Sequence, residues 1–158
     1  MRWIDFDSEA CSVHRTLEVV GEKWTMLLIR DAANGVHRFD DFRRHVGLSE
    51  AVLADRLRTL VGHGIFETRE YQEPGQRKRR EYRLTEKGWD LFPVLVALMQ
   101  FGDKHLGLDD GEPWMIQHKA CGHGVRAEVR CVHDDAVLTP RDTRSVPGTG
   151  ARSLEPAS

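Results

Sequence analysis

The chain has 158 residues, and its 23 lysines and arginines against 25 acidic residues give a formal net charge of −2. This length predicts one domain with room for a small appendage. The charge excludes a protein that is basic overall, so any affinity for nucleic acid must come from a local basic patch. The sequence carries neither a long apolar run nor a signal-peptide pattern, which argues against membrane insertion and export. Three cysteines do not suggest a secreted disulfide framework, so we expect a reducing cytoplasm.

Two helices are predicted at the N-terminal end. The first, 9–20, has its apolar residues on one face, and Gly21 ends it. The second, 24–33, is apolar on most sides, so we expect it to be buried, and Asn34 and Gly35 end it.

A short helix, a tight turn and a longer helix come next. The short helix, 39–46, has apolar residues three and four apart, and Gly47 fits its C-cap. Ser49 fits the N-cap of the longer helix, because its hydroxyl can accept a hydrogen bond from a first-turn N–H. The longer helix is predicted to stop at Gly62 and Gly64. The spacing is typical of a helix-turn-helix.

The longer helix has two different faces. Its apolar residues recur at helical spacing and predict a buried stripe of Val52, Leu53, Leu57, Leu60 and Val61. Small and polar residues, Ala51, Asp55 and Arg58, fall on the opposite face. A helix with a slim polar face fits a DNA major groove.

A basic β-hairpin is predicted directly behind this helix. Two strands, 65–71 and 81–85, flank a turn at Pro74 and Gly75. Cations crowd the expected tip: Arg77, Lys78, Arg79 and Arg80. With Arg83 and Glu81, residues 77–83 hold five cations and one acid, a net charge of +4. A basic hairpin behind a candidate recognition helix is typical of a winged helix-turn-helix, and the alternative is a core helix beside a solvated hairpin.

The last predicted helix runs from 86 to 105 and is apolar on more than one face. Pro93 predicts a bend or a break within it. One apolar face can cover the domain's own core, whereas the other needs a partner. The alternative is a single buried core helix.

The C-terminal part has a different character. A polar linker begins at Gly107, and residues 107–138 form an expected appendage with ligand-type side chains at His118, Cys121, His123, Cys131 and His133. These side chains could supply a tetrahedral Zn²⁺ site. Residues 125–132 alternate weakly, as a strand does, so a β-hairpin without metal is the alternative. Residues 139–158 are rich in Pro, Gly, Ser and Thr, which predicts a disordered tail.

The segment from Cys11 to about His105 closely resembles the HxlR-type, MarR-like winged-helix transcriptional regulators. The resemblance rests on signposts in a fixed order: Cys11, Gly21-x-x-Trp24-Thr25, Arg38-Phe39-x-x-Phe42-Arg43, Leu53-x-x-Arg56-Leu57-x-x-Leu60, Gly64-Ile65 and Tyr82-x-Leu84-Thr85-x-x-Gly88. It implies a mainly α fold with a small antiparallel β wing (α+β). It also implies a DNA-binding and dimerisation domain over 9–106. Similar tails on some relatives resemble a zinc ribbon, but here Asp134 stands where the last cysteine would be, which favours the β-hairpin.

The resemblance implies a cytoplasmic homodimer that pairs through the first and last helices and binds a pseudo-palindromic duplex operator as a repressor or activator. We expect Ser49, Ala51, Asp55 and Arg58 to face the bases, with Arg58 reading guanine. Arg56 lies on the helix flank and should reach a phosphate or an intramolecular carboxylate. The four cations of residues 77–80 should contact the backbone or the minor groove.

The resemblance also implies a redox or small-molecule signal. Cys11 matches the family's N-terminal redox cysteine, near the start of the first helix, where Ser8 is a candidate cap. We favour instead a small-molecule inducer held between the dimerising helices and the winged domain.

Two other classes of protein fit less well. A zinc-dependent enzyme built on the appendage would need an open metal position and a placed base, and the sequence lacks the corresponding His-Glu-x-x-His or His-x-Glu motifs. A winged helix that binds protein would carry apolar anchors at the hairpin tip, where this chain has four cations. We therefore expect a DNA-binding regulator and no enzyme.

Overall fold

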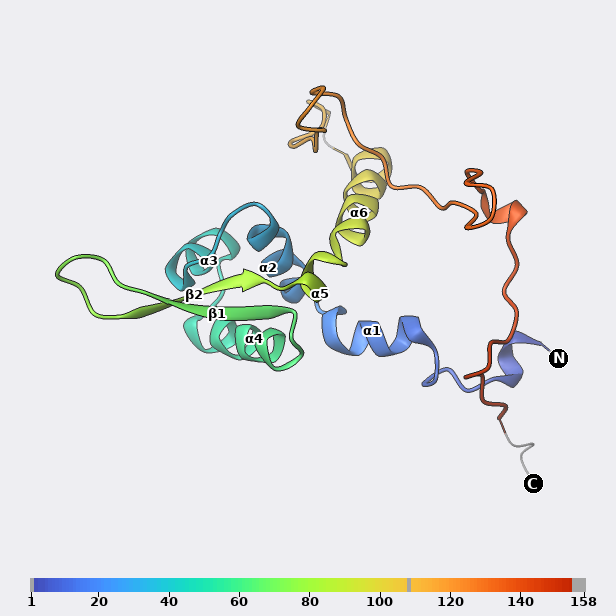
Figure 1. Cartoon of the computed structure of the whole chain (residues 1–158), viewed down its shortest axis with the longest axis horizontal. Helices are drawn as coiled ribbons and strands as arrows, with labels where there is room; N and C mark the ends of the chain where they lie inside the picture. The colour runs from blue at the N-terminus through green and yellow to red at the C-terminus, as the bar shows by residue number, and fades with distance from the viewer. Residues whose placement is uncertain (1, 108, 155–158) are drawn as a thin grey trace. The chain divides into compact units, whose positions relative to one another are not determined.

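The computed structural model describes residues 2–107 and 109–154, and these are mainly helical with one antiparallel pair of strands (Figure 1). The α-helices are α1 (Ser12–Val20), α2 (Lys23–Ala33), α3 (Phe39–Val46), α4 (Glu50–Gly62), α5 (Glu86–Trp89) and α6 (Phe92–His105). The strands are β1 (Phe66–Tyr71) and β2 (Arg79–Leu84), and the 3-10 turns are η1 (Trp3–Asp5) and η2 (Pro140–Asp142). Leu108 of the expected linker and 155–158 of the expected disordered tail lie outside the described residues.

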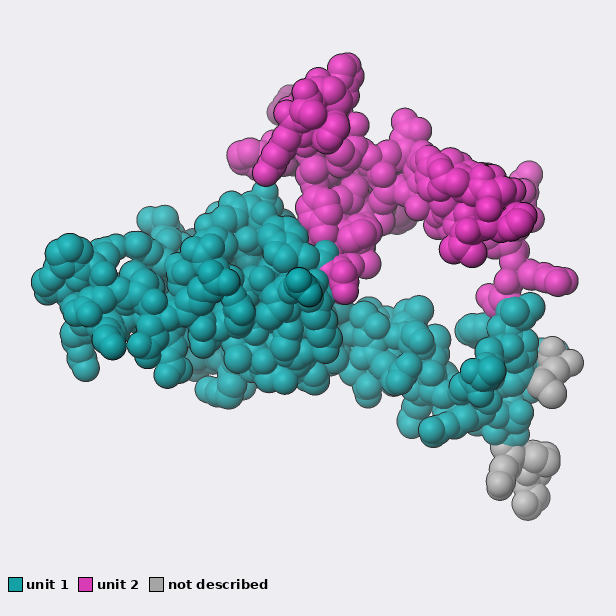
Figure 2. All heavy atoms as spheres, viewed as in Figure 1, with its two compact units in different colours: residues 1–89, 146–158 teal, residues 90–145 magenta. Residues whose placement is uncertain are grey.

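The chain divides into two compact units (Figure 2). One consists of residues 1–89 with 146–158, and the other of residues 90–145. The domain boundaries predicted from the sequence were different, at 9–106, 107–138 and 139–158.

The core of the first unit lies among α2, α3, α4 and the hairpin. Its fully buried side chains come from each of these elements: Leu28, Ile29, Phe42, Leu53, Leu57, Leu60 and Phe66. The rings of Phe42 and Phe66 stack with centroids 6.2 Å apart, which joins α3 to β1. This packing fixes the angle at which α3 and the hairpin hold α4.

The helix-turn-helix connection is confirmed. Gly47 ends α3 with φ +77°, a left-handed conformation that glycine adopts without a steric penalty. Ser49 is the N-cap of α4, and its hydroxyl oxygen accepts the N–H of Val52 at 3.4 Å. Local chemistry therefore sets both ends of the turn.

Fewer residues of α4 are buried than the sequence predicted. Leu53, Leu57 and Leu60 are buried, but Val52 in the first turn is 40% exposed. Its neighbour Leu53 takes the core position, because consecutive helical residues point about 100° apart.

The first helix begins later than expected, at Ser12, and its N-cap is Cys11 rather than Ser8. The preceding residues form a turn, in which the Asp7 carboxylate accepts the N–H of Glu9 at 2.8 Å. This hydrogen bond competes with continuation of the helix.

The second strand of the basic hairpin begins two residues earlier than expected. β2 begins at Arg79, and the antiparallel register pairs Tyr71 with Arg79 and Glu70 with Arg80. Arg79 and Arg80 thus belong to the strand, not to the tip. At the other end, the N–H of Tyr82 donates to the carbonyl of His37 at 2.8 Å, which ties the strand to the segment before α3.

The break predicted at Pro93 is confirmed. The expected single helix 86–105 is divided into α5 and α6, and Pro93 is the second residue of α6. Its missing N–H costs nothing there, because first-turn N–H groups have no partner within the helix. None of the described helices is long and apolar enough to span a membrane.

The expected β-hairpin of the appendage is not formed, since no described residue of 107–138 belongs to a strand. Isolated bridges occur in this segment instead, among them Gln117 with Gly124 and Arg130 with Val137. Its apolar residues have little to pack on, and Val132 is fully exposed. The weak alternation in the sequence therefore did not produce a buried sheet face.

The described part of the expected disordered tail makes two local structures. Thr139 caps η2, where its hydroxyl donates to the Asp142 carboxylate at 2.6 Å. Ser153 forms an antiparallel bridge with Phe6. Composition alone did not indicate either contact.

Candidate nucleic-acid interface

The exposed face of α4 carries the residues expected to meet DNA bases. Ala51, Asp55 and Arg58 are all exposed. Arg58 donates to the Asp55 carboxylate at 3.1 Å, one helical turn away, and both side chains are more than half exposed. An exposed pair of this kind contributes about 0–1 kcal/mol, so Arg58 can leave it at little cost. The structure therefore presents an available guanidinium on this face.

Arg56 lies on the flank of α4 and is used inside the protein. Its guanidinium donates to the Glu22 carboxylate at 2.6 Å, and its side chain is 28% exposed. Glu22 is the N-cap residue of α2, so this ion pair joins α4 to the start of α2. Arg56 was expected to reach either a phosphate or an intramolecular carboxylate, and in the structure it binds the carboxylate of Glu22.

The four expected wing cations have different surroundings. Lys78 lies 3.6 Å from the Glu70 carboxylate, and Arg79 lies 3.4 Å from that of Asp40 at the start of α3. Arg77 and Arg80 are exposed, and neither side chain has a hydrogen-bond or ion-pair partner in the part of the chain that the structure describes. Phosphate can therefore reach these two arginines without displacing an acid.

An open groove of about 500 Å³ separates the start of α3 from the wing. Its lining mixes cations, acids and aromatic rings: Arg38, Phe39, Asp40, Asp41, Tyr71, Lys78, Arg79, Arg80 and Tyr82. The Arg38 guanidinium lies 4.7 Å above the centre of the Tyr71 ring and bonds Glu73 at 2.8 Å. These contacts fix Arg38 between α3 and the hairpin.

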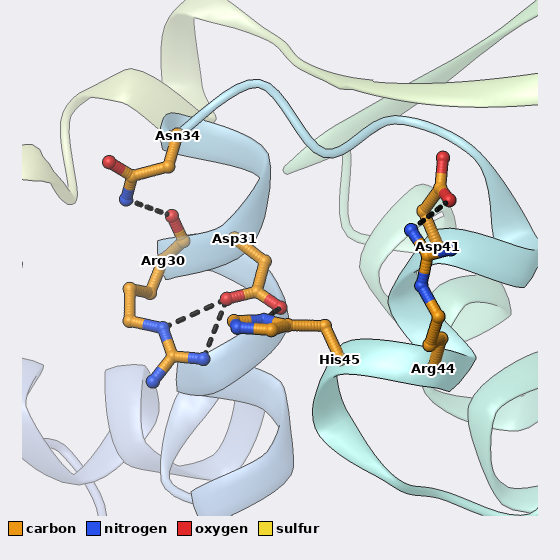
Figure 3. A network of polar contacts seen from close by, with 6 residues as sticks. All are labelled: Arg30, Asp31, Asn34, Asp41, Arg44 and His45. Carbon is orange, nitrogen blue, oxygen red and sulfur yellow. Dashed lines mark hydrogen bonds and ion pairs between the residues drawn. The ribbon is translucent and has the colours of Figure 1, made fainter.

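A polar network supports the helix-turn-helix from behind (Figure 3). The Asp31 carboxylate, 2% exposed, accepts the Nε and terminal N–H groups of Arg30 at 2.9 and 2.6 Å. Its second oxygen lies 2.6 Å from Nδ1 of His45, so the network joins α2 to the last turn of α3. A buried carboxylate is stable only with such partners. Sequence reasoning missed Asp31, although an acid in an otherwise apolar helix was a usable signal.

Cys11 is a half-buried free thiol at the N-cap of α1. The backbone N–H groups of His14 and then Val13 stabilise the thiolate, and the charge of Arg15 adds to them, so the pKa of Cys11 lies below its ordinary value. This environment favours a reactive thiol.

The five expected metal ligands are not brought together. Nδ1 of His118 lies 3.2 Å from Sγ of Cys121, while Nδ1 of His123 lies 2.9 Å from the Cys121 carbonyl oxygen. Among residues 2–107 and 109–154, no three His, Cys, Asp or Glu side chains stand close enough to hold one ion. The Zn²⁺ site stays a prediction.

A helix-turn-helix, an exposed polar face on its second helix and a basic hairpin behind it define a winged helix-turn-helix DNA-binding protein. Residues 19–110 match the HxlR-like helix-turn-helix family model, and the chain belongs to this family of transcriptional regulators.

The chain is 41% identical over 145 residues to an uncharacterized HTH-type transcriptional regulator of Mycobacterium tuberculosis, covering 92% of this chain and 90% of that relative. It is similar to the crystal structure of PA1607, a candidate transcription factor, with 37% identity, a TM-score of 0.79, and coverage of 89% of this chain and 97% of the other. It is also similar to the redox regulator HypR in its oxidized form, with 32% identity, a TM-score of 0.55, and coverage of 60% and 97%.

Proposed function

We propose that this regulator acts in the cytoplasm, without catalysis of its own, as a homodimer on a pseudo-palindromic DNA operator. The observation that carries the proposal is the exposed Asp55–Arg58 face of α4 beside a wing with two unpaired arginines. Each protomer would place α4 in a major groove and the wing on the flanking backbone.

Arg58 is the proposed specificity residue. On a matching site its guanidinium would exchange Asp55 for the two acceptors of a guanine, which a planar fork can bind together. Asp55 would then be free to accept from a cytosine amino group. Ala51 and Ser49 line the same approach near the start of α4.

The wing supplies affinity without sequence preference. Arg77 and Arg80 would bind phosphates directly, whereas Lys78 and Arg79 share their charge with Glu70 and Asp40. Each phosphate neutralised adds close to one to the slope of binding against salt.

Apolar faces on two helices support the dimer. Val13 and Leu17 of α1 are 65% and 56% exposed, and Val94, Leu98 and Phe101 of α6 are about half exposed. An exposed apolar face on a helix is unusual on a monomer, so we propose that a second copy of the chain covers each of these two faces.

The signal would be a small molecule or an oxidant. Cys11 has a lowered pKa, and the similar structure of HypR is that of a redox regulator. A small-molecule inducer remains the favoured signal.

Two measurements test this function. Sedimentation of the full chain should give twice the mass of the 18.1 kDa chain, and binding to duplex DNA should weaken steeply as salt rises. A monomer, or affinity for duplex that does not change with salt, would contradict the proposal.

A further inference from the structure

The second unit contains one backbone turn twice, 13 residues apart. In the first copy, 116–125, the N–H of His118 donates to the carbonyl of His123 at 2.8 Å. The N–H of Gly122 donates back to the carbonyl of His118 at 2.8 Å, and Val125 closes the turn by donating to Ile116 at 3.1 Å.

The second copy, 129–138, repeats these three hydrogen bonds position by position. Cys131 donates to Ala136 at 2.9 Å, Asp135 donates to Cys131 at 3.0 Å, and Leu138 donates to Val129 at 2.8 Å. Counted from His118 in the first copy and from Cys131 in the second, the fifth residue of each turn is left-handed: Gly122 has φ +71° and Asp135 has φ +59°. Asp135 is the one non-glycine residue with positive φ in the described chain, so the repeat holds even where glycine is absent.

Ligand-type side chains recur at the first and fourth positions of the two turns. These positions hold His118 and Cys121 in one copy and Cys131 and Asp134 in the other. In the first pair, Nδ1 and Sγ are 3.2 Å apart, and in the second Cys131 is close enough to Asp134 to lower the pKa of that carboxyl. Each turn thus carries two metal-binding groups three residues apart, and in the first turn the two groups already meet.

The other two histidines of the segment do not follow the repeat. His123 is the sixth residue of its turn, where the second copy has Ala136, and His133 is the third residue, where the first copy has Ala120. The repeat therefore selects four residues as candidate metal ligands and leaves out His123 and His133.

The spacing within a turn suits zinc. Two ligands of one tetrahedral Zn²⁺, with bonds of about 2.0 Å to nitrogen and 2.3 Å to sulfur, lie roughly 3.5 Å apart. The His118–Cys121 separation of 3.2 Å is already close to this value. Only a small side-chain movement would separate the two groups enough to share an ion.

We propose that the two turns together bind one Zn²⁺ per chain through His118, Cys121, Cys131 and Asp134. On binding, the two thiols release their protons to solvent, the imidazole binds as the neutral form and the carboxylate binds ionised. With two thiolates and one carboxylate on a dication, the site carries one net negative charge. No three such side chains stand close enough to hold an ion among the described residues, so the ion would draw the ligands of the two turns together.

Bound zinc would stabilise the appendage, which has little apolar packing of its own. Trp114, Met115, Val129 and Val132 are all exposed, so this segment has little core of its own. A metal that links two turns stabilises such a segment directly, because the unfolded chain has no preformed site.

The test uses the full chain purified without a histidine tag and measures metal content and the Co²⁺ absorption spectrum. The parent should contain one zinc per chain, and Co²⁺ should give the visible bands of a tetrahedral site with thiolate charge transfer. His118→Ala, Cys121→Ser, Cys131→Ser and Asp134→Ala should each bring the zinc content near zero. The matched controls His123→Ala and His133→Ala should keep one zinc.

A fifth variant guards against loss of metal through misfolding. Asp134→Cys should keep one zinc and strengthen the thiolate band of the Co²⁺ form, because three thiolates bind instead of two. A parent without stoichiometric zinc would overturn the proposal. So would loss of zinc from the His123 or His133 variants but not from the His118 or Asp134 variants.

Discussion

Arg56 of α4 donates to the carboxylate of Glu22 at 2.6 Å, so the helix expected to enter DNA is held to the first residue before α2. Arg56 and Arg58 are two positions apart on one helix, yet one faces inward to an acid and the other outward to solvent. Arg56 is therefore used within the protein, whereas Arg58 stays available for the proposed contact with DNA.

Loss of the Arg56–Glu22 pair should lower stability. Arg56→Ala should cost about 1 kcal/mol in the free energy of unfolding, because Glu22 is half exposed and solvent weakens the pair. Urea unfolding measures this cost, and Arg58→Ala on the same helix is the control, with a change within about 0.5 kcal/mol. Equal losses in the two variants would show that Arg56 is an ordinary surface residue.

Wing arginines should differ according to their partners. Arg77→Gln and Arg80→Gln should each reduce the salt slope of binding to nonspecific duplex by about one. Arg79→Gln should have a smaller effect, since Asp40 already neutralises part of its charge. Titrations at several salt concentrations measure the slopes, and a wing variant that kept the parent's slope would rule out its phosphate contact.

Gly88 should not tolerate a side chain. It is buried, and a Cβ there would collide with the carbonyl oxygen of Ile65. Gly88→Ala should therefore destabilise the first unit by about 1–3 kcal/mol. Gly62→Ala is the control, since a Cβ there meets open space and the change should be neutral or favourable by up to about 1 kcal/mol. Similar melting temperatures for both variants would be evidence against this packing.

Cys11 should react as a thiolate at lower pH than an ordinary cysteine. Its folded pKa is lowered by the backbone N–H groups of His14 and Val13, so the thiolate appears earlier as pH rises. The pH midpoint of alkylation at Cys11, followed by mass spectrometry, should lie below that of an unfolded peptide with the same residues. A midpoint at or above that of the peptide would contradict the assignment.

A role for Cys11 in signalling needs a separate measurement. Operator affinity should be compared for the parent and Cys11→Ser, with and without a mild oxidant. If both respond equally, Cys11 is not the sensor and an inducer remains the working hypothesis.

Much of the first unit could be predicted from local chemistry. Gly47 and Ser49 set the helix-turn-helix connection by backbone conformation and capping, which are properties of a few adjacent residues. Pro93 set a helix start for the same reason. Asp31, by contrast, depends on His45, 14 residues away, and a single sequence does not show which partner satisfies a buried acid.

The structure of the appendage could not be predicted from local chemistry in the same way. Composition indicated metal ligands, but which histidines follow the repeat became visible only from the hydrogen bonds of two turns 13 residues apart. Likewise, Arg79 and Arg80 joined the strand because of pairing with Tyr71 and Glu70, which the run of cations concealed.

Footprinting of the full chain on genomic fragments, repeated with Arg58→Ala, tests the central claim most directly. We predict a protected pseudo-palindrome whose half-sites are centred about one helical turn apart or a multiple of it. Arg58→Ala should bind that site about 5- to 150-fold more weakly, a loss of about 1–3 kcal/mol, and with relaxed base preference, while its affinity for nonspecific duplex falls far less. Protection by Arg58→Ala as strong and as selective as that of the parent would contradict α4 as the base-reading element.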